Sequence, residues 1–361
     1  MEEEIRLMKG NEALAHAAVR YGADGYFGYP ITPQSEVLET LSELRPWETT
    51  GMVVVLQAES EVAAINMVYG GASTGKAVMT SSSSPGVSLK QEGISYIAAA
   101  ELPALIVNVM RGGPGLGTIQ PSQADYFQAT KGGGHGDYHL IVLSPATVQE
   151  MTDFVGLGFD LAFKYRTPAM ILADGVVGQM MEKVVLPPFR PRRTAEQIRT
   201  QCPWAATGRF GRDHRNVITS LEMEPNAMEV NNLRLQDTYR RIEENEVRFQ
   251  EYFTDDAEYL IVAFGSVARI CLKAIEDARA AGLKIGLLRP ITLWPFPKQR
   301  IRQLAGQVKG ILTVELNAGQ MVEDVRLAAE CSVPVAHFGR MGGIVPNPTE
   351  VLEALHKNFN F

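Results

Sequence analysis

Two carboxylates stand two residues apart in the stretch LQAESEVAAINMVYGG, at the start of a predicted helix. A helix N-terminus favours a negative charge by ~0.3–1 kcal/mol, which is sufficient reason for the first of them, Glu59. It is a weaker reason for the second, Glu61, because the apolar residues 62–65 predict a buried setting. A buried carboxyl group needs a hydrogen-bonding or charged partner. Glu61 is therefore a candidate acid–base group, with helix-end electrostatics as the alternative.

An arginine opens a glycine-rich loop in VNVMRGGPGLGTIQPSQADYF. Arg111 follows a predicted strand, and its guanidinium could hold a carboxylate through two parallel hydrogen bonds. The glycines could instead form a phosphate or dinucleotide loop. However, residues 113–117 do not open directly onto a helix, and no Lys-Ser/Thr pair follows them. A mobile surface loop is the remaining alternative.

Two prolines stiffen a third loop, GYPITPQSE. Each proline fixes its own φ and pushes the residue before it into an extended conformation, which restricts Ile31 and Thr32. The loop either presents the hydroxyl of Thr32 for chemistry or is a stiff turn in which Thr32 or Ser35 caps the next helix.

A hydroxyl-rich turn, TSSSSPGVSLKQEG, leads into a further predicted helix. Ser84 followed by Pro85 is typical of a helix start, with serine as the N-cap and proline at the first helical position. Main-chain amides at such a start can also bind an anion.

Three potential metal ligands, His135, Asp137 and His139, alternate in KGGGHGDYHL. On one face of a strand this spacing could supply a metal site. The flanking glycines favour a turn, and no further carboxylate or cysteine cluster accompanies them. We therefore predict no metal site in this chain.

The elements between these loops alternate between strands and helices. The runs GYFGYP, MVVVL, KAVMT, ALIVNVM, LIVLS and AMILA predict short, buried parallel strands. Helical patterns lie between them at residues 11–21, 34–44, 60–69, 85–100, 121–129 and 147–163. This order predicts an α/β domain at residues 1–190 with a doubly wound parallel sheet. Ligands bind outside the carboxyl ends of such strands, where the loops above would meet.

A linker at residues 191–256 interrupts this order. It begins with the proline- and arginine-rich LPPFRPRRTAEQ, and its charged residues 226–250 predict one exposed helix. The runs YLIVAFGS, KIGLLR, GILTVEL and VPVAHFG then predict a four-stranded parallel α/β domain at residues 257–361. The turn LNAGQM is either an interface loop or an ordinary strand-to-helix turn.

The composition argues against several classes of protein. The 361 residues carry a net charge of −7, so no basic excess is present to bind nucleic acid or an anionic membrane. Polar residues interrupt the most apolar region, residues 94–110, and the N-terminus lacks the order of a signal peptide. Cys202, Cys271 and Cys331 fit a reducing cytoplasm and are too scattered to hold an iron–sulfur cluster. We expect a cytoplasmic protein without a membrane span.

Taken together, these segments resemble the α subunit of the 2-oxoacid:ferredoxin oxidoreductases, most closely that of the branched-chain 2-oxoisovalerate enzyme. The similarity rests on GNEA, GYPITPQSE, LQAESEVAAINMVYGGA, TSSSSPGVSLKQEG, VNVMRGGPGLGTIQPSQADYFQATKGGGHGDY, LLRPITLWPFP and TVELNAGQM. It implies a thiamine-diphosphate-enzyme pyrimidine-binding domain followed by a transketolase C-terminal-like α/β domain. The implied enzyme converts 2-oxoisovalerate and coenzyme A to acyl-CoA, CO₂ and reduced ferredoxin. A 2-oxoglutarate or pyruvate enzyme, and a non-catalytic scaffold subunit of the same fold, are the alternatives.

The resemblance also implies a thiamine diphosphate site that is divided between subunits. The α subunit holds the pyrimidine half, whereas a β subunit binds the diphosphate and Mg²⁺ and carries an iron–sulfur cluster. A γ subunit and a ferredoxin-like δ subunit complete the enzyme, so that 4Fe-4S clusters lie only in partner subunits and this chain is inactive alone. The sequence agrees, because Ala173-Asp174-Gly175 lacks the first glycine of the Gly-Asp-Gly magnesium signature and no asparagine follows at the expected distance.

The same resemblance assigns roles to residues. Glu61 would be the catalytic carboxyl group that is hydrogen-bonded to N1′ of thiamine, with Glu59 as the fallback. Thr32 and Arg111 would bind the 2-oxo acid, with Arg111 on its carboxylate. Further cofactor contacts would come from Tyr29, Pro30, Ile31 and Ser84.

Overall fold

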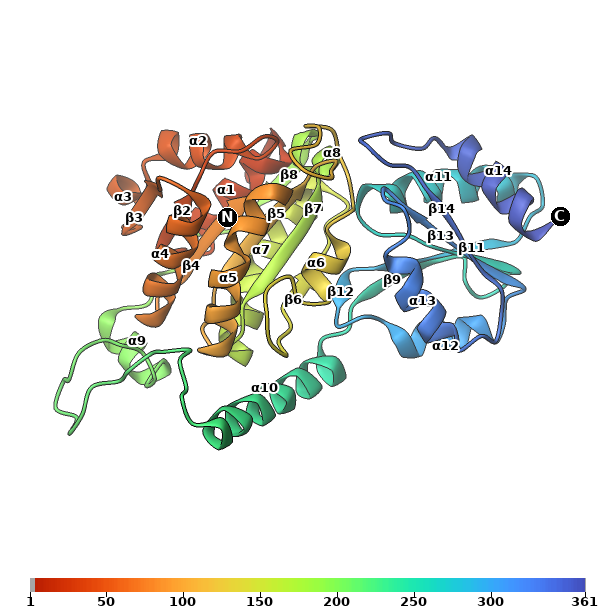
Figure 1. Ribbon diagram of the computed structural model, residues 1–361. Coiled ribbons are helices and arrows are strands. Elements are labelled where there is room, and N and C mark those ends of the chain that lie inside the picture. Colours follow the sequence, from red (N-terminus) through yellow and green to blue (C-terminus); the bar gives the residue numbers. More distant parts are fainter. Residues whose placement is uncertain (1–3, 361) are drawn as a thin grey trace.

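In the computed structural model, which describes residues 4–360, six strands of the first half of the chain and one strand of the second half form a seven-stranded sheet (Figure 1). All neighbouring strands in it are parallel, except the last pair, β12 with β6. In spatial order the strands are β3 (Val54–Gln57), β2 (Gly25–Gly28), β4 (Val78–Ser82), β5 (Leu105–Met110), β7 (Ala169–Asp174), β6 (Ile141–Leu143) and β12 (Thr292–Trp294). The predicted doubly wound parallel sheet is thus confirmed.

Helices cover both faces of this sheet, as right-handed crossovers require. Helix α4 (Glu61–Ser73) packs on α5 (Ser84–Ala99), whereas α1 (Gly10–Arg20) packs on α7 (Val148–Tyr165). The shorter helices are α2 (Ser35–Leu44), α3 (Pro46–Thr49), α6 (Tyr126–Thr130) and α8 (Gly175–Gln179). Because both faces are covered, the central strands β4, β5 and β7 are buried at every position. Strands β5 and β7 are accordingly mostly apolar, whereas β4, VMTSS, ends in hydroxyl residues.

A two-stranded ribbon that was not predicted lies beside this sheet. Strand β1 (Glu4–Lys9) pairs antiparallel with β8 (Met181–Leu186). Met8, Val184 and Leu186 of the ribbon form a small core, together with Ala13 and Val148 of the neighbouring helices.

The second sheet has five strands, of which four are the predicted parallel ones. In spatial order they are β14 (Val335–Gly339), β13 (Gly310–Glu315), β10 (Tyr259–Val262), β11 (Ile285–Pro290) and the antiparallel β9 (Phe249–Tyr252). The helices of this unit are α11 (Gly265–Ala280), α12 (Lys298–Ala305), α13 (Met321–Ala329) and α14 (Pro348–Phe359).

Two short strands depart from the sequence-based prediction. The linker helix was predicted to run to residue 250, but α10 (Pro225–Asn245) ends earlier and β9 follows it. The buried Glu246, just after α10, accepts hydrogen bonds from Lys164 and Tyr165 of α7 and so fixes the chain at that turn. Strand β12, in the second half of the sequence, pairs with β6 of the first sheet.

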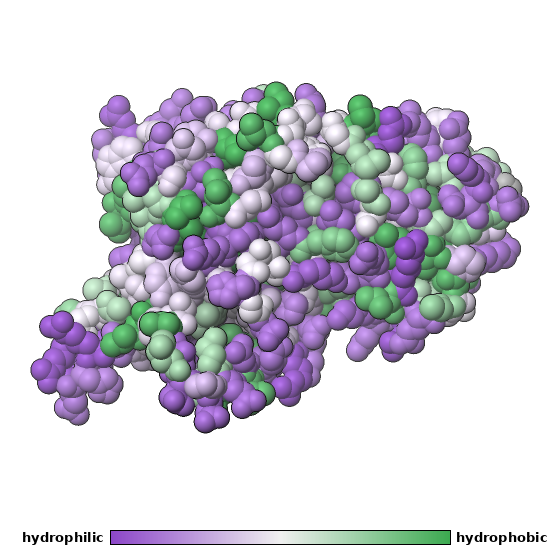
Figure 2. All heavy atoms as spheres, in the orientation of Figure 1, coloured by the Kyte–Doolittle hydropathy of each residue, from purple (hydrophilic) through white to green (hydrophobic). Residues whose placement is uncertain are grey.

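The linker consists of α9 (Ala195–Gln201), a loop and α10. The sequence predicted an exposed charged helix, yet α10 buries one stripe, which comprises Leu235, Thr238, Tyr239 and Ile242. The loop between the two helices projects at the lower left of Figure 1, and its tip is hydrophilic in Figure 2, although Val217, Leu221 and Met223 expose apolar side chains. Across residues 4–360, no helix has both the length and the apolar character that a membrane span needs.

Candidate active site

The two predicted substrate-binding residues meet at the carboxyl ends of β2 and β5, strands that β4 separates in the sheet. The guanidinium of Arg111 donates from Nη1 to the main-chain oxygen of Thr32 at 3.0 Å, across 79 residues of sequence. Its Nη2 donates to the main-chain oxygen of Leu116 at 2.8 Å. The buried Nε of Arg111 has no partner among the described residues. The arginine is therefore fixed in direction by two main-chain contacts while donors remain available to a ligand.

The proline-stiffened loop is held from within, by Gln34. Gln34 is the N-cap residue of α2, and neither Thr32 nor Ser35 caps this helix through its side chain, so the capping alternative is wrong. Instead, the side chain of Gln34 accepts from Ser81 Oγ and donates to the main-chain oxygen of Tyr29 at 3.3 Å. Thr32 and Pro30 are both exposed.

Ser84 ties the start of α5 to the strand end that carries Arg111. Its hydroxyl donates to Asp125 Oδ2 at 2.6 Å and accepts from the main-chain amide of Arg111 at 3.0 Å. Asn108 completes the network, donating to Asp125 at 2.9 Å and accepting from the Ser84 amide at 3.1 Å. Burial raises the pKa of Asp125, although the hydrogen bonds from Ser84 and Asn108 oppose this. The sequence placed the N-cap at Ser84, but the N-cap is Ser83, because the Ser84 hydroxyl is engaged with Asp125.

Glu61 is the first residue of α4 and is only 6% exposed, whereas Glu59 is exposed. Within residues 4–360 its carboxylate has neither a hydrogen bond nor an ion pair. Helix α5 approaches it so closely that a Cβ added at Gly86 would lie 2.9 Å from Glu61 Oε1. A largely buried carboxylate to which no described residue donates a hydrogen bond is typical of a functional group rather than a structural one.

A buried lysine that the sequence analysis did not identify lies near this carboxylate. Lys90 of α5 is fully buried, and its Nζ donates to Thr80 Oγ1 at 2.7 Å and to the main-chain oxygen of Ser81 at 3.1 Å. Burial lowers the pKa of Lys90 to about 7, while the Glu61 carboxylate raises it. The signal was present in the sequence, because Lys90 falls at helical spacing between the core residues Val87 and Ile94.

Asp174, in the incomplete magnesium signature, has a structural role. Its Oδ1 accepts from the amides of Val176 and Val177, each at 3.1 Å, and so caps α8. Its Oδ2 accepts from the amide of Ser266 in the second unit at 2.9 Å. Burial raises the pKa of Asp174, against these hydrogen bonds. Since both oxygens are engaged, the residues here do not fit the binding of the diphosphate-bound Mg²⁺.

The alternating residues of KGGGHGDYHL are spread apart. His135 and Asp137 are exposed, whereas the ring of His139 stacks on Trp294 with centroids 4.5 Å apart. Burial lowers the pKa of His139. Over residues 4–360, no group of three or more His, Cys, Asp or Glu side chains is arranged to hold a metal ion.

Two cavities differ in their chemistry. One of about 860 Å³ lies between the two units, where Ser84, Arg111 and Asp125 face Asn317 and Met341. It opens at the carboxyl ends of the strands, where ligands of parallel sheets bind.

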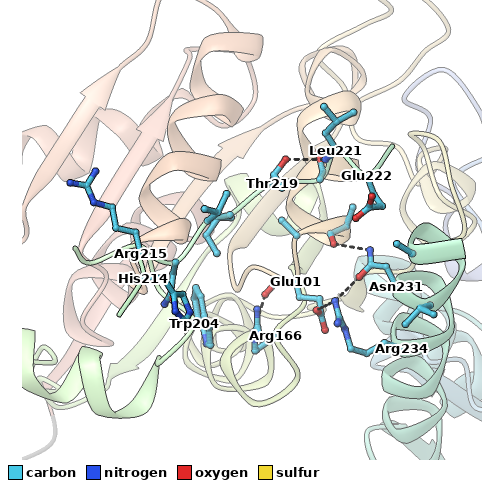
Figure 3. Close-up of a pocket in the computed structure, with 18 residues that line it drawn as sticks. Glu101, Arg166, Trp204, His214, Arg215, Thr219, Leu221, Glu222, Asn231 and Arg234 are labelled. Carbon is cyan, nitrogen blue, oxygen red and sulfur yellow. Dashed lines mark hydrogen bonds and ion pairs between the residues drawn. The ribbon is translucent and has the colours of Figure 1, made fainter. Parts of the chain in front are cut away.

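The other cavity, of about 600 Å³, lies between the linker loop and α10 at the far end of α5 (Figure 3). Two of its arginines are engaged by the protein itself: Arg234 pairs with Glu101 at 2.6 Å, and Arg166 lies 4.7 Å over the ring of Trp204. The first cavity is therefore the candidate substrate-binding part of the active site, and its lining includes Ser84 and Arg111 but neither Glu61 nor the GYPITPQSE loop.

Comparison with known families agrees with this geometry. Residues 16–252 match the family described as pyruvate flavodoxin/ferredoxin oxidoreductase, thiamine diphosphate-binding, and residues 257–351 match pyruvate:ferredoxin oxidoreductase core domain II. The fold and the strand-end loops thus define a thiamine diphosphate-binding domain of an oxidoreductase. More particularly, the chain belongs to the 2-oxoacid:ferredoxin oxidoreductase family.

Individual relatives extend this result. The chain is 50% identical, over 98% of its length and 97% of the relative's, to ketoisovalerate oxidoreductase subunit VorB of Methanothermobacter thermautotrophicus. It is 36% identical to 2-oxoglutarate synthase subunit KorA of the same organism, over 99% of both chains.

Solved structures show the same architecture. A 2-oxoglutarate:ferredoxin oxidoreductase from Magnetococcus marinus, solved with 2-oxoglutarate, coenzyme A and succinyl-CoA bound, matches with a TM-score of 0.86 and 26% identity, over 99% of this chain and 66% of that one. A split-gene transketolase matches with a TM-score of 0.58 at 15% identity, over 98% of both chains, a likeness of fold alone. The predicted fold class and family are thereby confirmed.

Proposed function

We propose that this chain is the α subunit of a 2-oxoacid:ferredoxin oxidoreductase that decarboxylates 2-oxoisovalerate oxidatively, with coenzyme A as acyl acceptor. The observation that carries the proposal is the buried, unpartnered Glu61 beside the strand ends where Thr32 and Arg111 meet. We assign the pyrimidine-binding half to residues 1–190, the linker to residues 191–256 and the transketolase C-terminal-like half to residues 257–361.

Thiamine diphosphate, when bound, supplies the nucleophilic carbon and the electron sink for decarboxylation. Glu61 would hold a proton at the pyrimidine N1′, a task that suits a desolvated carboxyl group without another partner. Glu59 is exposed, which favours Glu61 over it. The half-buried Tyr29 and Ile31, with Pro30 between them, would border the ring, and Ser84 would fix the neighbouring helix start.

Arg111 would bind the carboxylate of the 2-oxo acid through the donors that Thr32 and Leu116 leave free, in the two-bond arrangement that guanidinium favours. Thr32 would donate its exposed hydroxyl to the substrate. The cavity beside Arg111 also carries the exposed apolar side chains of Leu89, Leu116 and Met341. One cation among apolar side chains suits a branched aliphatic 2-oxo acid better than a dicarboxylate.

The rest of the cofactor site would come from partner subunits. A β subunit would bind the diphosphate and Mg²⁺, because both Asp174 oxygens are engaged within this chain. The 4Fe-4S clusters that pass electrons to ferredoxin would lie in the β subunit and the ferredoxin-like δ subunit, with a γ subunit completing the complex. Two of the three cysteines, Cys202 and Cys271, are buried, and all three thiols are free, which fits a cytoplasmic complex.

The test is to purify the chain with its co-expressed partner subunits and to compare ferredoxin reduction with 2-oxoisovalerate, 2-oxoglutarate, pyruvate and an aryl 2-oxo acid. We expect the highest kcat/KM with 2-oxoisovalerate and no activity for the chain alone. A higher value with 2-oxoglutarate or pyruvate would contradict the substrate. A complex that binds no thiamine diphosphate would instead identify a scaffold subunit.

A further inference from the structure

The fully buried Lys90 lies one helical turn beyond the residue of α5 that touches Glu61. Gly86 approaches the Glu61 carboxylate, and Lys90 follows it by four residues, which places both on the same side of the helix. The Nζ of Lys90 is fixed by Thr80 and Ser81 at the end of β4, at 2.7 and 3.1 Å. The ammonium group is thus held within the protein on the side of α5 that carries Glu61.

The other groups packed around Lys90 carry no charge that competes with Glu61. Strand β4 contributes hydroxyls and main-chain oxygens, and β2 contributes Tyr26, whose hydroxyl is 2.7 Å from Ser81 Oγ. Burial raises the pKa of Tyr26 to about 12, so this phenol is neutral in the working range. Among the described residues, Glu61 of α4 is the ionisable group whose charge acts on Lys90.

We propose that Lys90 is a positioning residue, whose ammonium group holds the buried Glu61 carboxylate in the direction of the pyrimidine of thiamine. An ammonium group attracts a nearby carboxylate, more strongly inside a protein than in water, and can therefore fix its orientation. The inference rests on the proposed function, since it gives Glu61 its role at the cofactor.

The experiment measures the dissociation constant of thiamine diphosphate between pH 6 and pH 9 in the complex copurified with partner subunits. The variants are Lys90→Met, Glu61→Gln and the double variant. The control is Lys76→Met, before the opposite end of β4, where the lysine pairs with Asp24 at 3.5 Å. We expect wild-type affinity to fall about tenfold as the pH rises through 7, because Lys90 loses its proton there.

Lys90→Met should bind about tenfold more weakly than wild type at pH 6 and equally at pH 9, whereas Lys76→Met should keep the wild-type profile. In the Glu61→Gln background, Lys90→Met should cause no further loss, because the lysine acts through the carboxylate. The proposal would be overturned if the affinity losses of Lys90→Met and Glu61→Gln added in full in the double variant. It would also be overturned if Lys90→Met kept the wild-type dependence of affinity on pH. Wild-type binding and turnover in Glu61→Gln would instead overturn the role of Glu61 in the proposed function.

A second readout needs no cofactor. Burial lowers the pKa of Lys90 from the ordinary 10.5 to about 7, so the unfolded chain binds more protons between these values. The stability of the wild-type chain relative to Lys90→Met should therefore rise with pH from about 7 to about 10.5 in urea unfolding of the full chain. A difference that does not change with pH would contradict the proposal. Should Lys90→Met fail to fold, Lys90→Gln, which keeps a donor for Ser81, replaces it.

Discussion

Two buried carboxylates at strand ends, one in each half of the chain, have opposite surroundings. Glu315 ends β13, is fully buried, and accepts hydrogen bonds from the amides of Gln320, Met321 and Val322 at 2.8–3.2 Å. Glu61 begins α4, is nearly as buried, and accepts none from the described residues. The chain itself completes the first environment and leaves the second for a ligand. The difference separates a structural carboxylate from a functional one more clearly than burial does.

The surroundings of Glu315 belong to a junction within the chain. Leu316 and Gln123 exchange hydrogen bonds at 3.0 and 3.1 Å, and Gln320 donates to the main-chain oxygen of Ala124 at 2.7 Å. The LNAGQM turn is thus an interface loop, but the surface it contacts is the PSQADYF segment of the same polypeptide. Hydrogen bonds satisfy the polar groups named here, and this network holds the two units in one arrangement.

Replacing Glu315 should produce the largest effect. Glu315→Ala leaves three main-chain amides buried without an acceptor, at ~1–3 kcal/mol each, so we expect the free energy of unfolding to fall by at least ~3 kcal/mol. Urea unfolding of the full chain measures this. Glu61→Ala is the matched control and should lower the free energy of unfolding by less, because no described residue donates a hydrogen bond to Glu61. An equal loss of unfolding free energy in Glu315→Ala and Glu61→Ala would contradict this difference between the two carboxylates.

Glu61→Gln should affect catalysis and not stability. Loss of a preorganised group at a reacting centre typically lowers turnover by ~10²–10³, and we expect at least this in the reconstituted complex. The complex should still assemble, because no described residue depends on a hydrogen bond from Glu61. Glu59→Gln is the control and should retain turnover. Retention by Glu61→Gln with loss by Glu59→Gln would move the role two residues upstream.

Arg111→Lys should weaken substrate binding by ~10–100-fold, the scale of a lost hydrogen bond to a charged group. Lysine keeps the charge but cannot reach Thr32 and Leu116 with a planar fork. The KM for the 2-oxo acid should rise while the affinity for thiamine diphosphate stays constant. A fall in cofactor affinity with unchanged KM would place Arg111 at the cofactor instead.

Ser84→Ala should have the smallest effect, about 1 kcal/mol of unfolding free energy, because it removes the hydroxyl between Asp125 and the Arg111 amide. If Ser84 contacts the cofactor as well, the affinity for thiamine diphosphate should fall in the same variant. An unchanged affinity would restrict Ser84 to its structural task.

The place of the candidate site could be predicted, because parallel strands are recognised from short apolar runs and ligands bind at their carboxyl ends. Apolar runs identified the parallel strands, and parallel strands place their following loops at one side of the sheet. The loops of Thr32 and Arg111 were therefore expected at the same edge, although their direct contact was not predicted. Lys90 was missed because a single charge in a helix is normally solvated, and only its register with Val87 and Ile94 indicates burial. The partner of the Ser84 hydroxyl lies 41 residues away, at Asp125, beyond the reach of local capping rules.

The short strands were the least predictable elements. Strands β9 and β12 have four and three residues, too few for a period to be visible, and their pairing depends on tertiary neighbours. The ribbon formed by β1 and β8 joins the two ends of the first half, a pairing that no local pattern specifies.

Strand β12 also affects how the chain can be divided. It supplies the outermost strand of the first sheet from sequence that lies beyond the linker, and Arg289 of the adjoining β11 pairs with Glu150 of α7. A fragment that stops within the linker would leave β6 with unpaired main-chain groups, a template for self-association. The two halves are thus cofolding parts of one molecule, and a soluble fragment of the first would need to retain residues through Trp294.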